Sequence, residues 1–316
     1  MTVKTISAAT DIAAAAALSV GAHEHLRSEL PFLPARSTAD FVPRIAWMTQ
    51  NGTVLGRFEG TQLAAFLGAF PLADFRHAGP GSVSPDWCHG SGSGTDVAST
   101  YRQLYRALAP HLIAQGCRIH AFSFYASECQ AIAAMGLTGF GHIVMDAGRP
   151  TAELLTELPA GPVDIDTYRA GPQDAVELAE LDAALAAHIA APPVFMPNPQ
   201  PRSAVQWAEW LSMPGRVALL ARRHGRMVGF IKAEQPQFDV TYAVHGDSTL
   251  AINGMYVTPA SRRAAVGRSL LASLVREAAA TGKEIVSVDC ETTNPEAYAF
   301  WSRWFRPVTW SLERRV

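Results

Sequence analysis

The fold of this chain is decided by the stretch Ile252-Asn-Gly-Met-Tyr-Val-Thr-Pro-Ala-Ser-Arg-Arg-Ala-Ala-Val-Gly-Arg-Ser-Leu-Leu271. Its apolar start predicts a strand that stops at Pro259, because proline has no backbone N–H to give to a sheet. A turn of small residues and arginines follows. A helix then begins, with Val266, Leu270 and Leu271 on one face. The stretch therefore predicts a strand, a turn and a helix in direct succession.

The turn in this stretch is suited to bind a phosphate group. The first amides of a helix have no partner within the helix and carry a partial positive charge. Ala265 and Gly267 have little or no side chain, so a ligand can approach their backbone closely. Arg262, Arg263 and Arg268 add positive charge around it. An ordinary turn with solvated arginines has the same features, so the turn alone leaves both interpretations open.

The same order of elements occurs twice in the chain, on either side of a stretch rich in glycine and proline at 149–162. In the first half we expect strands at 3–8, 53–59, 63–71, 82–89, 119–125 and 142–146, and helices at 12–28, 38–48, 97–115 and 128–135. In the second half we expect strands at 164–169, 216–223, 227–234, 251–257, 285–290 and 308–314, and helices at 174–190, 203–212, 265–281 and 295–304. The repeat predicts an α/β fold of two similar domains, 1–148 and 163–316, each with a mixed sheet flanked by helices. The linker, 149–162, holds a short helix at 152–158.

The composition excludes several classes of protein. The chain has 316 residues, of which 48% are hydrophobic and 17% charged, so it is not a disordered protein. A formal charge of −2 without a basic stripe argues against a nucleic-acid binder. The four cysteines have neither zinc-ligand spacing nor the density of a disulfide framework, which predicts a cytoplasmic protein without a metal. The alanine-rich run at 12–22 is about half as long as the ~20 apolar residues of a membrane span, so we expect no membrane association.

Two spaced motifs in the second half carry a resemblance to a known family. The first is Val257-x-Pro259-x-x-Arg262-x-x-Ala265-x-Gly267, and the second is Asn294-Pro-Glu-Ala297-Tyr-Ala-Phe300-Trp301. They resemble the Arg/Gln-x-x-Gly-x-Gly/Ala turn and the Asn-x-x-Ala-x-x-Leu-Tyr helix of the GCN5-related N-acetyltransferases, the GNAT superfamily. The resemblance covers residues 163–316 and implies a mostly antiparallel sheet, repeated as two GNAT-like domains in tandem.

The resemblance implies where acetyl-CoA would bind. In the family, the motif strand separates from its neighbour and the pantetheine arm lies between the two. The backbone of Met255, Tyr256 and Val257 would bind pantetheine and polarise the thioester carbonyl. Asn294 would orient pantetheine or a water molecule, with Trp301 on the same helix. The pyrophosphate would be held by the turn and the start of the helix, at Arg262, Arg263, Ala264, Ala265, Val266, Gly267 and Arg268.

The first half resembles a degenerate copy of the same unit. Leu137-Thr-Gly-Phe-Gly141 is similar to the terminal Gly-Phe of the family, and residues 101–115 occupy the position of the motif helix. The preceding loop, Gly90-Ser-Gly-Ser-Gly-Thr-Asp96, has no arginine and ends on a carboxylate that would repel a diphosphate. Ala126 stands where Asn294 falls in the second half. We therefore expect acetyl-CoA in the second half.

Candidates for proton transfer follow from position. Trp301 stands where the family often has a tyrosine, and an indole N–H does not ionise usefully, so it cannot be the acid. Tyr298 is the predicted acid, because positions 294, 298 and 301 share a helix face; a tyrosine that only packs is the alternative. Glu234, at the end of its strand, is the first choice for the base. The alternatives for the base are Asp239, Asp289 and Glu291.

The sequence thus predicts an acetyl-CoA-dependent N-acetyltransferase that acts on a small-molecule amine, with catalysis in the second half. The proline-rich stretch 188–201 precedes Trp207 and Trp210, and it predicts either an acceptor pocket or a rigid packing loop. A non-catalytic module that binds acetyl-CoA or another ligand is the alternative function. A homodimer is a candidate assembly, and the acceptor amine is not specified by any motif.

Overall fold

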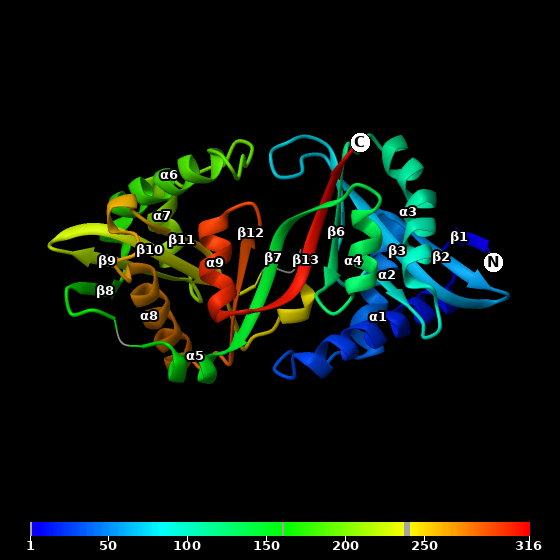
Figure 1. Cartoon of the computed structure of the whole chain (residues 1–316), viewed down its shortest axis with the longest axis horizontal. Coiled ribbons are helices and arrows are strands. Elements are labelled where there is room, and N and C mark those ends of the chain that lie inside the picture. Colours follow the sequence, from blue (N-terminus) through cyan, green and yellow to red (C-terminus); the bar gives the residue numbers. More distant parts are fainter. Residues whose placement is uncertain (1, 160, 237–240) are drawn as a thin grey trace. The chain divides into compact units, whose positions relative to one another are not determined.

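The computed structural model describes residues 2–159, 161–236 and 241–316, and these form two compact units. Unit 1 consists of residues 2–146, 241–245 and 307–316. Unit 2 consists of residues 147–159, 161–236 and 246–306. Each unit contains a mixed sheet with helices on its faces (Figure 1), which confirms the predicted fold class.

The elements of unit 1 follow the predicted order from β1 to β7, except at 82–89. Its helices are α1 (Ala9–Glu29), α2 (Thr38–Asn51), α3 (Val97–Ala114) and α4 (Cys129–Gly136), with a 3-10 turn η2 (Tyr242–Val244). Its strands are β1 (Thr2–Thr5), β2 (Thr53–Glu59), β3 (Gln62–Leu72), β4 (Gly81–Ser84), β5 (His89–Ser91), β6 (Ile119–Tyr125), β7 (Gly141–Pro150, which continues into unit 2) and β13 (Arg306–Arg315). They pair in the order β1-β2-β3-β4-β6-β13-β7, and β5 pairs with β3.

The predicted single strand at 82–89 is wrong. The structure has two strands there, β4 and β5, separated by a turn in which Cys88 N donates to Pro85 O at 3.0 Å. Pro85 has no backbone N–H, so it ends the ladder between β4 and β6. The chain then pairs with β3, where His89 lies opposite Leu67.

The last strand of the chain lies with unit 1. β13 pairs antiparallel with β6, with Thr309 opposite Tyr125. Leu312 is buried in the same core cluster as Phe122 and Phe124, so apolar packing accompanies the pairing. Residues 307–316 thus belong to unit 1, and the predicted domain limits, 1–148 and 163–316, stay a prediction.

Unit 2 contains the predicted strand, turn and helix at residues 252–271. Its helices are α5 (Thr151–Glu157), α6 (Ala175–Ala190), α7 (Ala204–Ser212), α8 (Val266–Ala280) and α9 (Pro295–Trp304), with 3-10 turns η1 (Pro172–Asp174) and η3 (Pro259–Ser261). Its strands are β8 (Ile165–Arg169), β9 (Val217–Arg223), β10 (Arg226–Glu234), β11 (Thr249–Val257) and β12 (Ile285–Glu291). They pair in the order β12-β11-β10-β9-β8, in which β11 and β12 are parallel and the other pairs antiparallel.

Helices cover both faces of the sheet in unit 2 (Figure 1). Alternate residues of β9 and β10, including Leu220 and Phe230, pack with Leu178 of α6 and with Trp207 and Trp210 of α7. Helix α8 covers the other face. Because the strand period is two, this arrangement fixes which side chains of β10 and β11 lie under α6 and α7.

Candidate functional site

The site lies where β11 separates from β12. These parallel strands pair from Thr249 opposite Ile285 to Ile252 opposite Val288, and the pairing then stops. Both strands continue beyond this point, β11 to Val257 and β12 to Glu291. The last five residues of β11, 253–257, therefore have no described strand partner on the β12 side. Their backbone groups on that edge are available to a ligand.

A β-bulge in β11 coincides with the separation. Lys232 of β10 lies opposite Gly254 and Ala233 lies opposite Ile252, so Asn253 is the extra residue. A bulge bends its strand and increases the local twist, which turns β11 away from β12. The Asn253 side chain donates a hydrogen bond to Glu234 Oε1.

Glu234 is held by its neighbours. Its second carboxylate oxygen, Oε2, lies 3.0 Å from Arg216 Nε, and the Glu234 residue is 8% exposed. The carboxylate thus fastens the bulge to the start of β9. Of the alternative bases, Asp289 lies exposed on β12 and Glu291 lies at its end. Asp239 lies outside the described residues.

Helix α8 begins without a side-chain cap. Its N-cap residue, Ala265, is left-handed with φ 65°, and Arg263 before it is left-handed with φ 61°. The first helical hydrogen bond runs from Ser269 N to Ala265 O at 2.9 Å. The amides of residues 266–268 therefore precede the first bond and point out of the helix end. Amides arranged around left-handed residues form a concave anion site.

A cavity of about 880 Å³ joins these features. Its walls come from β11, from the turn before α8, from the start of α8, from α6 and from α9. The residues that line it are Leu185, His188, Met255, Tyr256, Val257, Pro259, Ser261, Arg262, Arg263, Ala265, Val266, Gly267, Arg268, Asn294, Glu296, Ala297, Phe300, Arg303 and Trp304. The cavity brings together ten of the twelve residues predicted to bind the cofactor; Ala264 lies in the same turn, and Trp301 lies in the packed side of α9.

The charge of the cavity suits an anion. Four arginines line it, with Glu296 as the only acidic group in its described lining. Glu296 is paired with Arg262, which also donates from Nε to Val257 O at 3.3 Å. Arg268 Nε is buried and has no hydrogen-bond partner among the described residues. An orphaned guanidinium donor at the start of a helix fits a site for a phosphate group.

Helix α9 begins for a reason that the sequence displays. The Asn294 side chain accepts a hydrogen bond from Ala297 N at 3.1 Å, and Pro295 takes the first helical position, where no N–H is needed. This places Asn294 and Phe300 on the cavity.

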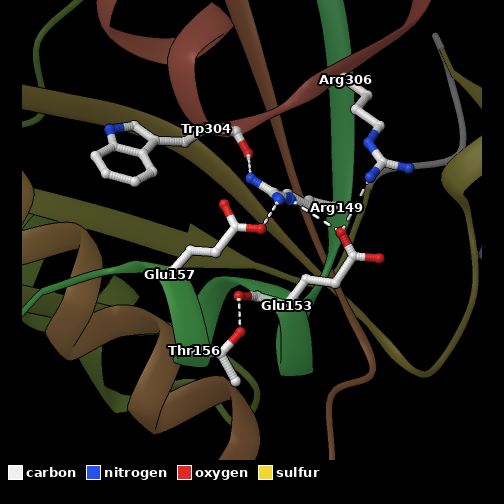
Figure 2. Close-up of polar contacts among 6 residues, drawn as sticks. All are labelled: Arg149, Glu153, Thr156, Glu157, Trp304 and Arg306. Carbon is white, nitrogen blue, oxygen red and sulfur yellow. Dashed lines mark hydrogen bonds and ion pairs between the residues drawn. The ribbon is translucent and has the colours of Figure 1, made fainter.

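The end of α9 is fastened by Arg149 (Figure 2). Arg149 Nη1 donates to Trp304 O at 3.0 Å, which satisfies a carbonyl that the helix end leaves free. The same guanidinium pairs with Glu157 and, through Nε, with Glu153 Oε2 at 3.1 Å. Arg306 also reaches Glu153 Oε2, at 3.3 Å. This network holds Trp304, a residue of the cavity wall, against α5.

Tyr298 lies in different surroundings from Asn294 and Trp301, the two residues predicted to share its helix face. Asn294 lines the cavity and Trp301 is 4% exposed, in edge contact with Phe300 and Phe305. Tyr298 is 37% exposed and is absent from the described cavity lining. Its role as an acid stays a prediction.

The predicted acceptor segment is divided in the structure. His188 lines the cavity, whereas Trp207 and Trp210, on the buried side of α7, pack in the core of unit 2. Lys232 was missed, although it interrupts an apolar run in β10 from Met227 to Ala233, a signal that the sequence does contain. It is 6% exposed, and burial lowers the pKa of its ammonium group to about 8.

The described residues contain neither a membrane-spanning helix nor a cluster of metal-ligand side chains. No helix among them has the length and hydropathy required to cross a bilayer. No three histidine, cysteine, aspartate or glutamate side chains among them converge as a metal site would require.

A protein-family model matches the part of the chain that lines the cavity. Residues 183–305 match the model of the acetyltransferase (GNAT) family, and that range contains every described residue of the cavity wall. No curated protein matches the sequence.

Among solved structures, a match with a TM-score above 0.5 shows the same fold over nearly the whole chain. A GCN5-related N-acetyltransferase from Sphaerobacter thermophilus matches with a TM-score of 0.61 at 12% identity, over 99% of this chain and 95% of that chain. A tandem GNAT protein from the clavulanic acid biosynthesis pathway matches with a TM-score of 0.49 at 14% identity, over 99% and 98% of the two chains. At such identity the likeness to the Sphaerobacter protein shows the fold alone.

Proposed function

We propose that this chain, whose residues 183–305 belong to the GNAT acetyltransferase family, transfers an acetyl group from acetyl-CoA to a small-molecule amine in unit 2. The observation that carries the proposal is the cavity at the point where β11 leaves β12. It combines a free strand edge, an uncapped helix start and four arginines within one space of about 880 Å³. A volume of this size accommodates a large ligand.

Each part of the cavity has a role in this proposal. The free edge of Met255, Tyr256 and Val257 would pair with the amides of pantetheine and polarise the thioester carbonyl. The amides from Arg263 to Arg268 would hold the pyrophosphate. Asn294 would orient the arm at the far wall. The acceptor amine would approach from the side of α6, where His188 lines the cavity.

A second function is favoured by one observation. No tyrosine hydroxyl of α9 lies in the described cavity lining, since Tyr298 is exposed outside it. A protein that binds acetyl-CoA without turnover would show this feature.

Cytoplasmic location and a homodimer remain predictions.

Two measurements test the proposal. Acetyl-CoA at one hundred times its Kd should stabilise the protein by about 2.7 kcal/mol, a rise in melting temperature of roughly 5–10 °C for a unit of this size. Thiol release from acetyl-CoA against a panel of small amines should then exceed a blank without amine. The blank is needed because Cys129 is an exposed thiol. Stabilisation without thiol release would favour the non-catalytic module, and absence of both would overturn the proposal.

A further inference from the structure

Lys232 is an unusual residue for its position in the fold. The chain contains only three lysines, Lys4, Lys232 and Lys283. Lys4 pairs with Asp11 on an exposed strand, and Lys283 donates to a backbone carbonyl at the surface. Lys232 is 6% exposed on a strand that runs through the middle of the unit 2 sheet. A buried ammonium group is costly, so a lysine at this position needs a cause.

The side chain of Lys232 crosses β11 at the start of the strand separation. Lys232 lies opposite Gly254, the first residue after the bulged Asn253. A Cβ atom on Gly254 would lie 2.6 Å from Lys232 Cε, so the lysine side chain lies over Gly254 and would have to shift if residue 254 had a side chain. Because Phe230 and Tyr256 pack under α6 and α7, the strand period places Lys232 and Gly254 on that same face. This is the side from which an acceptor would approach.

Charged groups from α6, β10, β12 and the loop before α7 act on Lys232. Arg202 lowers the pKa of Lys232 further, whereas Asp182 on α6, Glu234 on β10 and Asp289 on β12 raise it; burial is the largest cause and sets the direction. Two of the carboxylates are already engaged. Asp182 accepts a hydrogen bond from Arg202 N at 2.8 Å, and Glu234 is bound by Arg216 and Asn253. Neither is therefore placed to take a proton as readily as a neutral lysine amine would.

We propose that Lys232 is the general base of acetyl transfer and that its Nζ accepts the proton that the acceptor amine loses. This inference rests on the proposed function, because it assumes that the thioester lies along the free edge of β11. Lys232 takes the role of base that the sequence predicts for Glu234. The hydrogen bond from Asn253 and the ion pair with Arg216 instead fit a structural role for Glu234 at the bulge.

The proton returns within one reaction cycle. The amine nitrogen attacks the thioester carbonyl carbon, a C–N bond forms, and one N–H proton passes to neutral Lys232. The C–S bond then breaks with its electron pair on sulfur. The Lys232 ammonium gives its proton to the thiolate, so CoA leaves as the thiol and the lysine is neutral again. The products are the acetamide and CoA, and no further reactant is required.

The first test measures the lysine directly. Protein labelled with [ε-13C]lysine should give three side-chain signals, which Lys4→Arg and Lys283→Arg assign by elimination. A titration from pH 6 to 11 should show Lys232 losing its proton near pH 8, well below the ordinary lysine value of about 10.4. If Lys232 titrates near that ordinary value, the proposal is overturned, whatever the activity of the protein.

The second test measures catalysis with the best amine of the panel. Lys232→Met should lower kcat by about 10²–10⁴-fold and remove the acidic limb of the pH profile, while the Kd for acetyl-CoA stays within about twofold of wild type. Lys232→Arg should lose activity as well, because a guanidinium keeps the charge but accepts no proton. Lys283→Met, a surface lysine exchanged in the same way, should leave kcat and the pH profile unchanged.

Stability separates a chemical from a structural role. The lowered pKa means that protonation of Lys232 costs stability below pH 8, and that stability rises as the pH passes from 8 to the unfolded value. Lys232→Met should therefore melt higher than wild type at pH 7 although it is inactive. A variant with wild-type kcat and an intact acidic limb would overturn the proposal. Failure of the wild type to bind acetyl-CoA would instead defeat the proposed function, which the titration of Lys232 does not depend on.

Discussion

The two units begin their corresponding helices in opposite ways. In unit 2, α8 starts after a left-handed Ala265 without a side-chain cap, and arginines surround its first amides. In unit 1, α3 starts after Asp96, whose Oδ1 accepts a hydrogen bond from Ser99 N at 3.1 Å. A capping carboxylate and a bound phosphate use the same amides and carry the same sign of charge. One helix start is therefore open to an anion, and the other already contains one.

The parallel strand pairs of the two units, β11–β12 and β4–β6, also end differently. In unit 2, β11 and β12 separate around the cavity. In unit 1, the chain itself covers the end of β4 and β6: Asp86 accepts hydrogen bonds from Tyr242 N at 3.0 Å and Ala243 N at 2.9 Å, and Val244 packs with Tyr125. Burial raises the pKa of Asp86 to about 6 in this position. The same order of elements therefore leaves a cavity in unit 2 and a covered strand end in unit 1.

The largest difference between the units is expected in acetyl-CoA binding after a change at Gly267 in unit 2 or at Gly92 in unit 1. A Cβ on Gly267 would lie 3.5 Å from Met255 Cε, and a Cβ on Gly92 would lie 3.5 Å from Ala64 O, so both positions tolerate a side chain. Gly267→Asp places a carboxylate among the amides of the anion site and should weaken acetyl-CoA binding at least about 100-fold, or roughly 3 kcal/mol. Gly92→Asp, the matched change in unit 1, should leave the Kd near wild type.

Calorimetric titration of both variants measures this contrast. Melting curves show whether each variant remains folded. Equal losses of binding from the two changes would mean that the sites are assigned to the wrong units.

A smaller effect is expected from removal of the cap in unit 1. Asp96→Ala should cost about 1 kcal/mol of stability, because Ser99 N loses its acceptor. It should not create a second acetyl-CoA site, since the loop at 90–96 has no arginine. Urea denaturation and a binding titration check the two parts. A gain of a second binding event would show that the cap alone keeps acetyl-CoA out of unit 1.

The smallest effect is expected at the left-handed residues. Ala265 has φ 65°, a conformation that costs an L-residue roughly 1 kcal/mol relative to glycine, so Ala265→Gly should raise stability by up to about 1 kcal/mol. Gly94 in unit 1 has φ 79°, and Gly94→Ala should lower stability by a similar amount. Acetyl-CoA binding should change less than about twofold in either variant. Opposite signs in the two melting shifts confirm the account; equal signs contradict it.

Local signals explain what could be predicted from the sequence. Pro259 ends β11, Pro295 follows the capping Asn294, and small residues mark the turn before α8, so the strand–turn–helix and the start of α9 were predictable. These features depend on residues within one or two turns of one another. Ten of the residues predicted to bind acetyl-CoA line one cavity, and their role in binding stays a prediction.

Distant contacts explain what could not be predicted. The pairing of β13 with β6 joins residues nearly two hundred positions apart, and no local pattern specifies it. The bulge at Asn253 depends on Arg216 and Glu234 from other strands. Tyr298 was expected on a shared face with Asn294, but Trp301 takes the buried position and leaves the tyrosine exposed.

The stoichiometry of acetyl-CoA binding tests the central claim most directly. Isothermal titration of the wild-type chain should give one acetyl-CoA per chain, because only unit 2 has an open helix start beside a separated strand pair in the described residues. Two binding events per chain would contradict the proposed difference between the units. No binding would contradict the assignment of the cavity itself.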